Sequence, residues 1–125
     1  MADDGSSERG AVFTRPEVVT AVLDLSGYCS DRPLHRMRLL EPSFGDGDFL
    51  LPAVERLLAA YQRNVPDLRH SLSDLRRAVR AVELHSASHA GTAQRLVHCL
   101  TNAGISEADA NALCDAWLEG VLDFV

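Results

Sequence analysis

Cysteine is scarce in this sequence, and the few cysteines present are poorly placed for pairing. Cys29, Cys99 and Cys114 are odd in number, lie far apart and include no Cys-x-x-Cys pair. Disulfide frameworks and zinc knuckles need even numbers or close spacing, so this pattern argues against both. The three are therefore predicted to be small packing residues, and the compartment that they favour is the reducing cytoplasm.

Long apolar runs and an excess of basic residues are also missing. No stretch reaches the roughly eighteen apolar residues of a membrane span, and the acidic, polar residues 1–10 lack the pattern of a signal peptide. Twelve Lys and Arg residues stand against eighteen Asp and Glu, so the net charge is -6. We predict that the chain contains no membrane segment and that it does not by itself bind the phosphates of a nucleic acid. Residues 1–11 are expected to be a disordered lead-in, and residues 12–125 part of one domain.

The first ordered segment is predicted to be a helix that begins near residue 15. Thr14 and Glu17 have capping-box spacing, and Pro16 would sit in the first turn, where its missing N–H costs little. Gly27 is placed to end this helix. The expected buried face consists of apolar residues at helical spacing: Val18, Val19, Val22, Leu23 and Leu25.

Further along the chain, short apolar runs alternate with helical patterns. Three strands are predicted, at residues 37–41, 78–85 and 120–125. The first of these strands is expected to be buried on both faces. Helices are predicted at 49–63, at 86–103 before Gly104, and at 107–118 after the capping residue Ser106, with a polar connection at 64–77. Because parallel neighbours need crossover helices, this order predicts a parallel, right-handed α/β sheet.

The segment GDGDF is predicted to form the turn that leaves the first strand. Gly45 and Gly47 can adopt positive φ and let the backbone pass close under a ligand, although such glycines also serve as plain tight turns. Glu41, Asp46 and Asp48 would repel a pyrophosphate and would favour a ligand with a cationic end. Alternatively, the two aspartates only hydrogen-bond turn amides. On the ligand-binding interpretation, a branched side chain at position 47 would occupy the space of the ligand.

Glu83 lies near the end of the second predicted strand, at the end of the segment AVRAVE. Carboxylates in this position of nucleoside-binding α/β folds accept hydrogen bonds from ribose hydroxyls. The alternative is a solvated carboxylate at a strand end.

Together, these segments resemble the N6-adenine DNA methyltransferases of restriction–modification systems. FTRPEVV resembles the family's segment before the first strand, with Thr14 and Pro16 against the methionine part of the cofactor. LLEPSFGDGDFL resembles the cofactor loop, with Glu41 near the amino acid moiety. The resemblance implies an α/β Rossmann-like fold, truncated after about three parallel strands, and S-adenosylmethionine as the cofactor. It places the following residues at the cofactor: Thr14, Pro16, Glu41, Pro42, Gly45, Asp46, Gly47, Phe49, Glu83, Leu84, Asp123 and Phe124.

The later motifs of the family are assigned in the same way. AVEL would place Glu83 on the ribose, and WLEGVLDFV would place Asp123 on the adenine amino group with Phe124 near the ring. The family's catalytic Asn-Pro-Pro-Tyr segment does not follow, since none of the five prolines is adjacent to another. We therefore expect a truncated chain that is inactive alone, with DNA as the substrate of the complete enzyme and the catalytic segment supplied elsewhere, for instance by a complementary chain.

Two other functions stay open at this point. The chain is alternatively a non-catalytic interaction module of the antitoxin kind, or part of a methyltransferase for RNA, protein or a small molecule. Cofactor binding separates the first alternative from the leading interpretation.

A few other side chains invite a functional interpretation, but a structural role is favoured for each. His85 and His89 lie four residues apart without a third ligand nearby, so solvated histidines are favoured over a metal site. Trp117 is expected to fill the core beneath the third strand. The arginines at 76, 77 and 80 could touch DNA, but a solvated helix end is the preferred interpretation.

Overall fold

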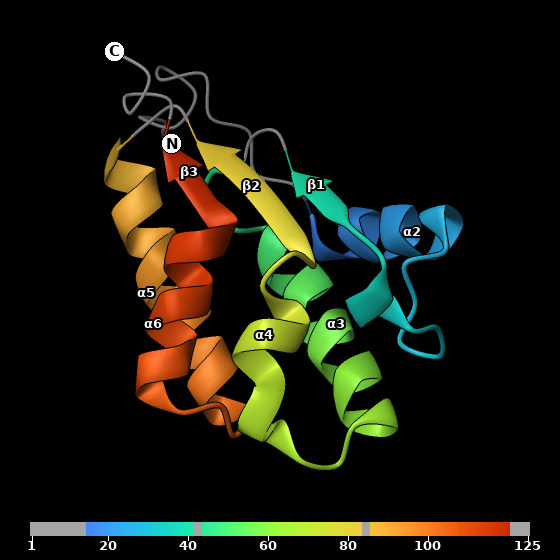
Figure 1. Ribbon diagram of the computed structural model, residues 1–125. Coiled ribbons are helices and arrows are strands. Elements are labelled where there is room, and N and C mark those ends of the chain that lie inside the picture. Colours follow the sequence, from blue (N-terminus) through green and yellow to red (C-terminus); the bar gives the residue numbers. More distant parts are fainter. Residues whose placement is uncertain (1–14, 42–43, 84–85, 121–125) are drawn as a thin grey trace, which may run out of the picture.

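The computed structural model describes residues 15–41, 44–83 and 86–120, which form a small α/β unit (Figure 1). The α-helices are α2 (Pro16–Ser26), α3 (Leu50–Asn64), α4 (Ser71–Leu75), α5 (Ser86–Asn102) and α6 (Glu107–Trp117). The strands are β1 (Leu39–Glu41), β2 (Val79–Glu83) and β3 (Leu118–Gly120). Two 3-10 turns, η1 (Leu34–Arg36) and η2 (Leu68–His70), complete the described elements. The predicted alternation of strands and helices is confirmed.

The three strands form one parallel sheet in the order β1-β2-β3. Leu39 pairs with Val79, and Ala81 pairs with Leu118, which sets the register across the sheet. The carboxyl ends of all three strands therefore lie along one edge, where a parallel α/β sheet places its ligand crevice. The predicted parallel topology is confirmed for these residues.

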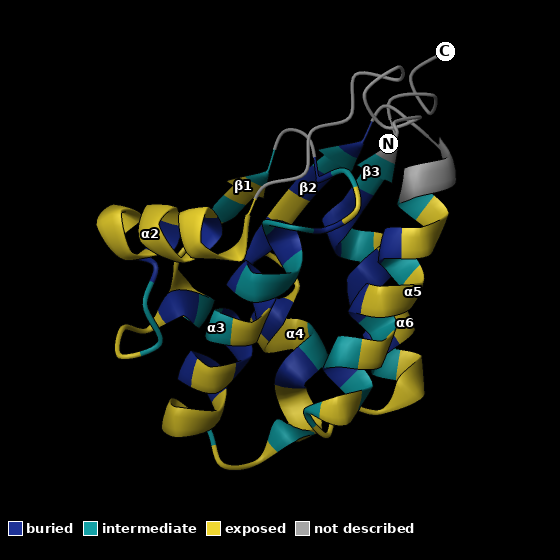
Figure 2. Ribbon diagram, turned by 180° about the vertical axis from the view of Figure 1, so that it is seen from behind, coloured by how far each residue is buried: buried dark blue, intermediate teal, exposed yellow. Residues whose placement is uncertain are grey.

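The core lies between the sheet and the helices that follow its strands. Helix α3 buries Leu50, Val54 and Leu57, while α6 buries Trp117 completely. Buried residues are coloured dark blue in Figure 2. The indole Nε1–H of Trp117 donates a hydrogen bond of 2.8 Å to the carbonyl oxygen of Leu75 in α4. The predicted structural role of Trp117 is thus confirmed, because the ring joins two helices under the sheet.

Local capping signals place most helix ends correctly. Ser106 accepts a hydrogen bond from the amide of Asp109 at 3.2 Å and caps α6. Gly104, with a φ of +103°, follows the end of α5. The connection at 64–77, which was predicted to be polar, contains η2 and α4. These ends depend on neighbouring residues only, so sequence spacing is sufficient to find them.

Helix α2 differs from its prediction in two ways. Its N-cap is Arg15 without a side-chain hydrogen bond, and the expected capping residue Thr14 lies outside the described residues. Only Val19 and Leu23 are buried, because residues four apart share the single narrow stripe that faces the protein. The other apolar positions are exposed, to 47% at Val18, 42% at Val22 and 87% at Leu25.

Two strand predictions also need correction. Strand β1 is not buried on both faces, since Leu40 is 68% exposed on the face opposite the core. Strand β3 begins at Leu118, directly after α6, whereas it was expected to begin at residue 120. Residues 121–125, like the predicted lead-in 1–11, lie outside the described residues. Within the described ranges, no helix is long and apolar enough to cross a membrane.

Candidate functional site at the carboxyl ends of the strands

The loop after β1 depends on two glycines in the left-handed region. Gly45 has a φ of +51° and Gly47 a φ of +89°, conformations that side chains rarely adopt. The amide of Gly47 donates to the carbonyl oxygen of Phe44 at 2.8 Å, and the amide of Leu51 donates to the carbonyl oxygen of Gly47 at 2.9 Å. The tight turn therefore leads directly into α3, as predicted.

Glu83 is joined to this loop across 38 residues of sequence. The amide of Gly45 donates a hydrogen bond of 2.6 Å to Oε1 of Glu83. The side chain is only 3% exposed, so the alternative of a solvated strand-end carboxylate is wrong. Two motifs that the sequence suggested separately, the glycine loop and the acidic end of β2, form one contact at the strand ends.

Thr92 in α5 completes this contact and was not among the predicted residues. Its hydroxyl donates a hydrogen bond of 2.7 Å to the carbonyl oxygen of Gly45, so the Gly45 residue is held through both its amide and its carbonyl. Thr92 is 1% exposed. Its place in the second turn of the helix after β2 could have drawn attention to it, because that helix begins at the same edge of the sheet.

A side chain added at Gly45 would meet open space, whereas one added at Gly47 would meet packed atoms. A Cβ at Gly45 would meet nothing within 4 Å, whereas a Cβ at Gly47 would lie 2.9 Å from Cδ1 of Leu51 and 3.3 Å from Cγ2 of Thr92. The expectation that a side chain at position 47 enters ligand space is therefore wrong. Position 47 points into the packing of α3 and α5, and position 45 faces open space.

The acidic side chains of the loop differ in exposure. Asp46 is exposed, while Glu41 and Asp48 are half-buried. Among the described residues, no hydrogen bond to the side chain of Asp46 or Asp48 is found. Phe49 is the N-cap residue of α3 and packs partly buried against the core.

The remaining predicted residues are only partly described. Pro16 begins α2, which lies on the far side of β1 from β2 (Figure 1). The others lie outside the described residues: Thr14, Pro42, Leu84, Asp123 and Phe124. The described part of the site therefore consists of the glycine loop, Glu83 and Thr92.

His89, at the same edge of the sheet, packs against an aromatic ring. The ring of His89 meets that of Phe44 edge-on, with centroids 5.5 Å apart and an interplanar angle of 63°. In the described ranges, no group of three potential ligands could hold a metal ion, and His85 lies outside them. Neither histidine is therefore proposed as a metal ligand.

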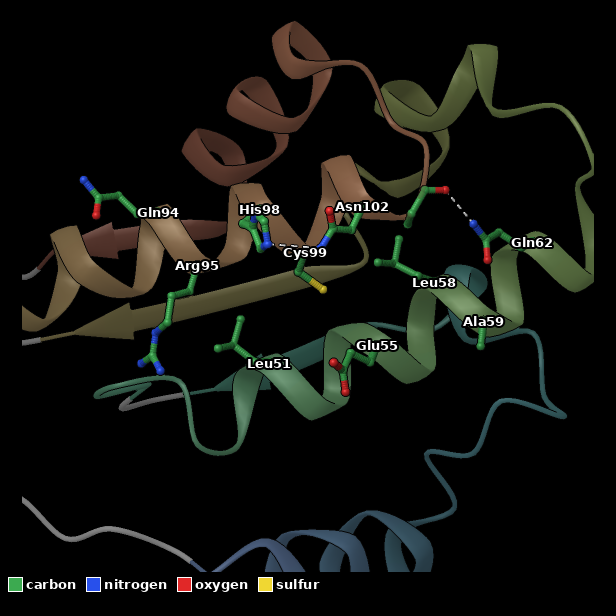
Figure 3. Close-up of a pocket in the computed structure, with 11 residues that line it drawn as sticks. Leu51, Glu55, Leu58, Ala59, Gln62, Gln94, Arg95, His98, Cys99 and Asn102 are labelled. Atoms are coloured by element: carbon green, nitrogen blue, oxygen red, sulfur yellow. Dashed lines mark hydrogen bonds between the residues drawn. The ribbon is translucent and has the colours of Figure 1, made fainter.

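A separate hollow of about 610 Å³ lies between α3 and α5 (Figure 3). Leu51, Leu58 and Cys99 form part of its wall, with Glu55 and Arg95 also lining it. None of its lining residues belongs to the predicted cofactor set. The hollow is therefore distinct from the loop at the strand ends.

Cys114 is buried in the core, and Cys99 is half-buried and packs against it. Burial raises the pKa of the Cys99 thiol, and burial with the nearby Asp115 raises the pKa of Cys114 to about 11. A thiol with a raised pKa is almost entirely protonated near neutral pH and is a poor nucleophile. The predicted structural role is confirmed for these two residues.

Comparison with known proteins identifies relatives for the sequence as a whole. No protein-family model and no solved structure matches the chain. The chain is 48% identical to the Type II methyltransferase M.PaeR7I of Pseudomonas aeruginosa over 136 aligned residues, which cover all of this chain and 24% of that protein.

Two further relatives carry the same kind of name. The chain is 44% identical to the Type II methyltransferase M.XhoI of Xanthomonas vasicola, covering 89% of this chain and 20% of that protein. It is 38% identical to the Type II methyltransferase M.BstVI of Geobacillus stearothermophilus, covering 87% of this chain and 19% of that protein. The chain is thus homologous to Type II methyltransferases and spans about a fifth to a quarter of their length.

Proposed function

We propose that this chain is the amino-terminal, cofactor-binding part of an N6-adenine DNA methyltransferase that uses S-adenosylmethionine. The observation that carries the proposal is the 2.6 Å hydrogen bond between the Gly45 amide and Glu83, which brings a glycine loop and a buried carboxylate together at the carboxyl ends of parallel strands. The identities of 38–48% to Type II methyltransferases support the methyltransferase part of this proposal.

The described residues suit this cofactor. The open space beside Gly45 would admit a ligand close to the backbone. Residues 41–49 contain three carboxylates and no Lys or Arg, a composition that favours a cationic ligand and disfavours a pyrophosphate. S-adenosylmethionine carries a cationic sulfonium and, when bound, supplies the methyl group for transfer.

Each residue has a defined role in the proposed site. The backbone at Gly45 and Gly47 lies beneath the ligand, Glu41 is near its amino acid moiety, and Glu83 accepts hydrogen bonds from the ribose hydroxyls. By the family resemblance, Asp123 and Phe124 contact the adenine. Thr92 acts indirectly, because its hydroxyl holds the Gly45 carbonyl and so fixes the loop.

The DNA-modifying step requires more than these residues. An adenine must leave the base stack before its amino group can react. The Asn-Pro-Pro-Tyr segment that holds the flipped base in the resembling family is absent from the 125 residues, so a further segment or a complementary chain would supply it. A chromosomal DNA substrate would place the protein in the cytoplasm, the compartment that its unpaired cysteines favour.

We expect the chain to bind S-adenosylmethionine saturably in isothermal titration calorimetry, and Gly45→Ala to weaken that binding about tenfold. The added methyl group would enter the open space where the ligand should lie. Gly91→Ala is the matched control, since a Cβ there also meets nothing within 4 Å but lies at an exposed position of α5. Undiminished affinity in Gly45→Ala would sink the loop assignment. Absence of any binding would favour a non-catalytic interaction module.

We also expect the purified chain to transfer no methyl group to DNA. It lacks the segment that holds the flipped base, and its net charge of -6 offers little attraction for phosphates. The measurement is incorporation of labelled methyl from S-adenosylmethionine into mixed-sequence DNA, with full-length M.PaeR7I as the positive control. Activity above a heat-killed blank would contradict this division between binding and catalysis.

A further inference from the structure

Thr92 on α5 contacts both glycines of the loop, each through a different branch of its side chain. Its hydroxyl donates a hydrogen bond of 2.7 Å to the carbonyl oxygen of Gly45. Its methyl carbon Cγ2 lies 3.3 Å from where a Cβ at Gly47 would stand, so the methyl group packs beside that glycine. Serine at this position would supply only the first contact, and valine only the second. Both contacts together require threonine.

A second residue of α5 reaches the same loop. His89 lies three residues before Thr92, on the same side of the helix, and its ring meets the buried ring of Phe44 with centroids 5.5 Å apart. Phe44 directly precedes Gly45. Helix α5 begins at the edge of the sheet where β2 ends (Figure 1). The helix therefore supports the loop from one side, at Phe44 and at both glycines.

The Gly45 residue connects Thr92 to Glu83. Its amide donates to Oε1 of Glu83 at 2.6 Å, while its carbonyl oxygen accepts from Thr92. The exposed fractions of Glu83 and Thr92 are 3% and 1%, so water does not readily replace either partner. Because glycine has no side chain to restrict φ and ψ, hydrogen bonds at both of its backbone groups are needed to hold one conformation. A shift of the carbonyl would move the amide as well, and with it the contact to Glu83.

We infer that Thr92 is a positioning residue of the proposed cofactor site, and that it acts through Gly45 on Glu83. The inference rests on the proposed function, in which Glu83 accepts hydrogen bonds from the ribose. The hydroxyl of Thr92 fixes the Gly45 peptide, and the fixed amide holds the Glu83 carboxylate in the orientation that the ribose needs. Thr92 therefore governs affinity for the nucleoside half of the ligand, whatever the charge on the ligand's sulfur.

The main test compares Thr92→Val with the unmodified 125-residue chain in isothermal titration calorimetry. We expect Thr92→Val to weaken the binding of S-adenosylmethionine about tenfold, the scale of one lost buried hydrogen bond. S-adenosylhomocysteine carries the same ribose but a neutral sulfur, and its binding should weaken by the same factor. The conservative variant Thr92→Ser keeps the hydroxyl and should recover binding of both ligands to within about threefold of the unmodified chain.

Two further variants test the route by which Thr92 acts. Thr101→Val is the matched control on the same helix, because the Thr101 hydroxyl donates within α5, to the carbonyl oxygen of His98 at 3.0 Å, and its loss should leave affinity unchanged. In a double-mutant cycle, Thr92→Val combined with Glu83→Gln should bind at most about threefold more weakly than Glu83→Gln alone. Residues that act through one contact are not additive, whereas independent residues are.

A second measurement requires no ligand. In the unmodified chain, the hydrogen bond to Glu83 protects the Gly45 amide from exchange with solvent. We expect Thr92→Val to accelerate exchange of this amide, followed by nuclear magnetic resonance, by about tenfold. Thr92→Ser and Thr101→Val should leave the exchange rate close to that of the unmodified chain.

Circular dichroism establishes that each variant is folded. If Thr92→Val does not fold, Thr92→Ala and Thr92→Ser replace the comparison, since both lack the methyl group beside Gly47 and only the second keeps the hydroxyl. The alanine variant should then bind both ligands about tenfold more weakly than the serine variant.

Several results would overturn the inference. They are undiminished affinity in Thr92→Val, an equal loss in Thr92→Ser, a loss confined to S-adenosylmethionine, and additive losses in the double-mutant cycle. If the unmodified chain binds neither ligand, the proposed function fails, and exchange of the Gly45 amide alone decides whether Thr92 positions the loop. Unchanged exchange in Thr92→Val would show that it does not.

Discussion

Gly47→Val is expected to lower the free energy of unfolding by about 3 kcal/mol or more, the combined scale of a left-handed backbone cost and an overpacked core. The φ of +89° is unfavourable for a β-branched residue. The new Cβ would lie 2.9 Å from Cδ1 of Leu51 and 3.3 Å from Cγ2 of Thr92, at the junction of α3 and α5. Urea unfolding followed by circular dichroism measures the change. Binding of S-adenosylmethionine should be lost together with the fold.

Gly45→Val is the matched control for this prediction. Gly45 also has a positive φ, at +51°, but a Cβ there meets nothing within 4 Å. Both variants carry a backbone cost, which is smaller at position 45 because a φ of +51° lies within the left-handed region that L-residues reach, so the difference between their unfolding free energies contains the clash at position 47 and the larger backbone cost there. If the two variants lose the same stability, packing against Leu51 and Thr92 is not what makes glycine necessary at position 47.

Glu83→Ala is expected to reduce both stability and cofactor affinity. Deleting the carboxylate removes the acceptor of the 2.6 Å hydrogen bond from the Gly45 amide, and the loss is expected to be about 1–3 kcal/mol. The proposed contact with ribose hydroxyls would be lost as well, which on the same scale weakens S-adenosylmethionine binding by roughly 5- to 150-fold. Urea unfolding measures the first effect and calorimetry the second.

Two further variants separate the roles of Glu83. Glu83→Gln keeps an oxygen that can accept from Gly45, so stability should stay near that of the unmodified chain while cofactor affinity falls. Glu55→Ala deletes an exposed carboxylate on α3 and should change neither quantity by more than about 0.5 kcal/mol. Unchanged cofactor affinity in Glu83→Ala would leave Glu83 with a purely structural role. A Gln variant as unstable as the Ala variant would show that the loop is not held through this acceptor.

The predicted backbone positions of the glycine loop and of Glu83 were accurate where they depended on local chemistry. Gly45 and Gly47 were expected to take positive φ in a turn after a strand, and both do. Glu83 was expected at the end of the neighbouring strand, and it lies there. The prediction failed on the direction in which a side chain added at position 47 would point. This direction is set by contacts with Leu51 and Thr92, which lie beside the loop only when α3 and α5 have packed.

By itself, the sequence determined the order of strands and helices, the parallel topology, the Ser106 cap and the helix end at Gly104. The element order and the helix ends depend on residues close together in the chain, since capping, turn formation and hydrophobic periodicity are local properties. The parallel topology follows from that order, because strands joined by a crossover helix run parallel. Only the tertiary structure decided the burial of Glu83, its contact with Gly45 across 38 residues, and the contribution of Thr92. The tertiary structure likewise exposed Val18, Val22, Leu25 and Leu40, which apolar spacing had assigned to buried faces. Periodicity identifies which side chains are apolar, but burial requires a neighbouring element to cover them, and that neighbour is set by how distant parts of the chain pack.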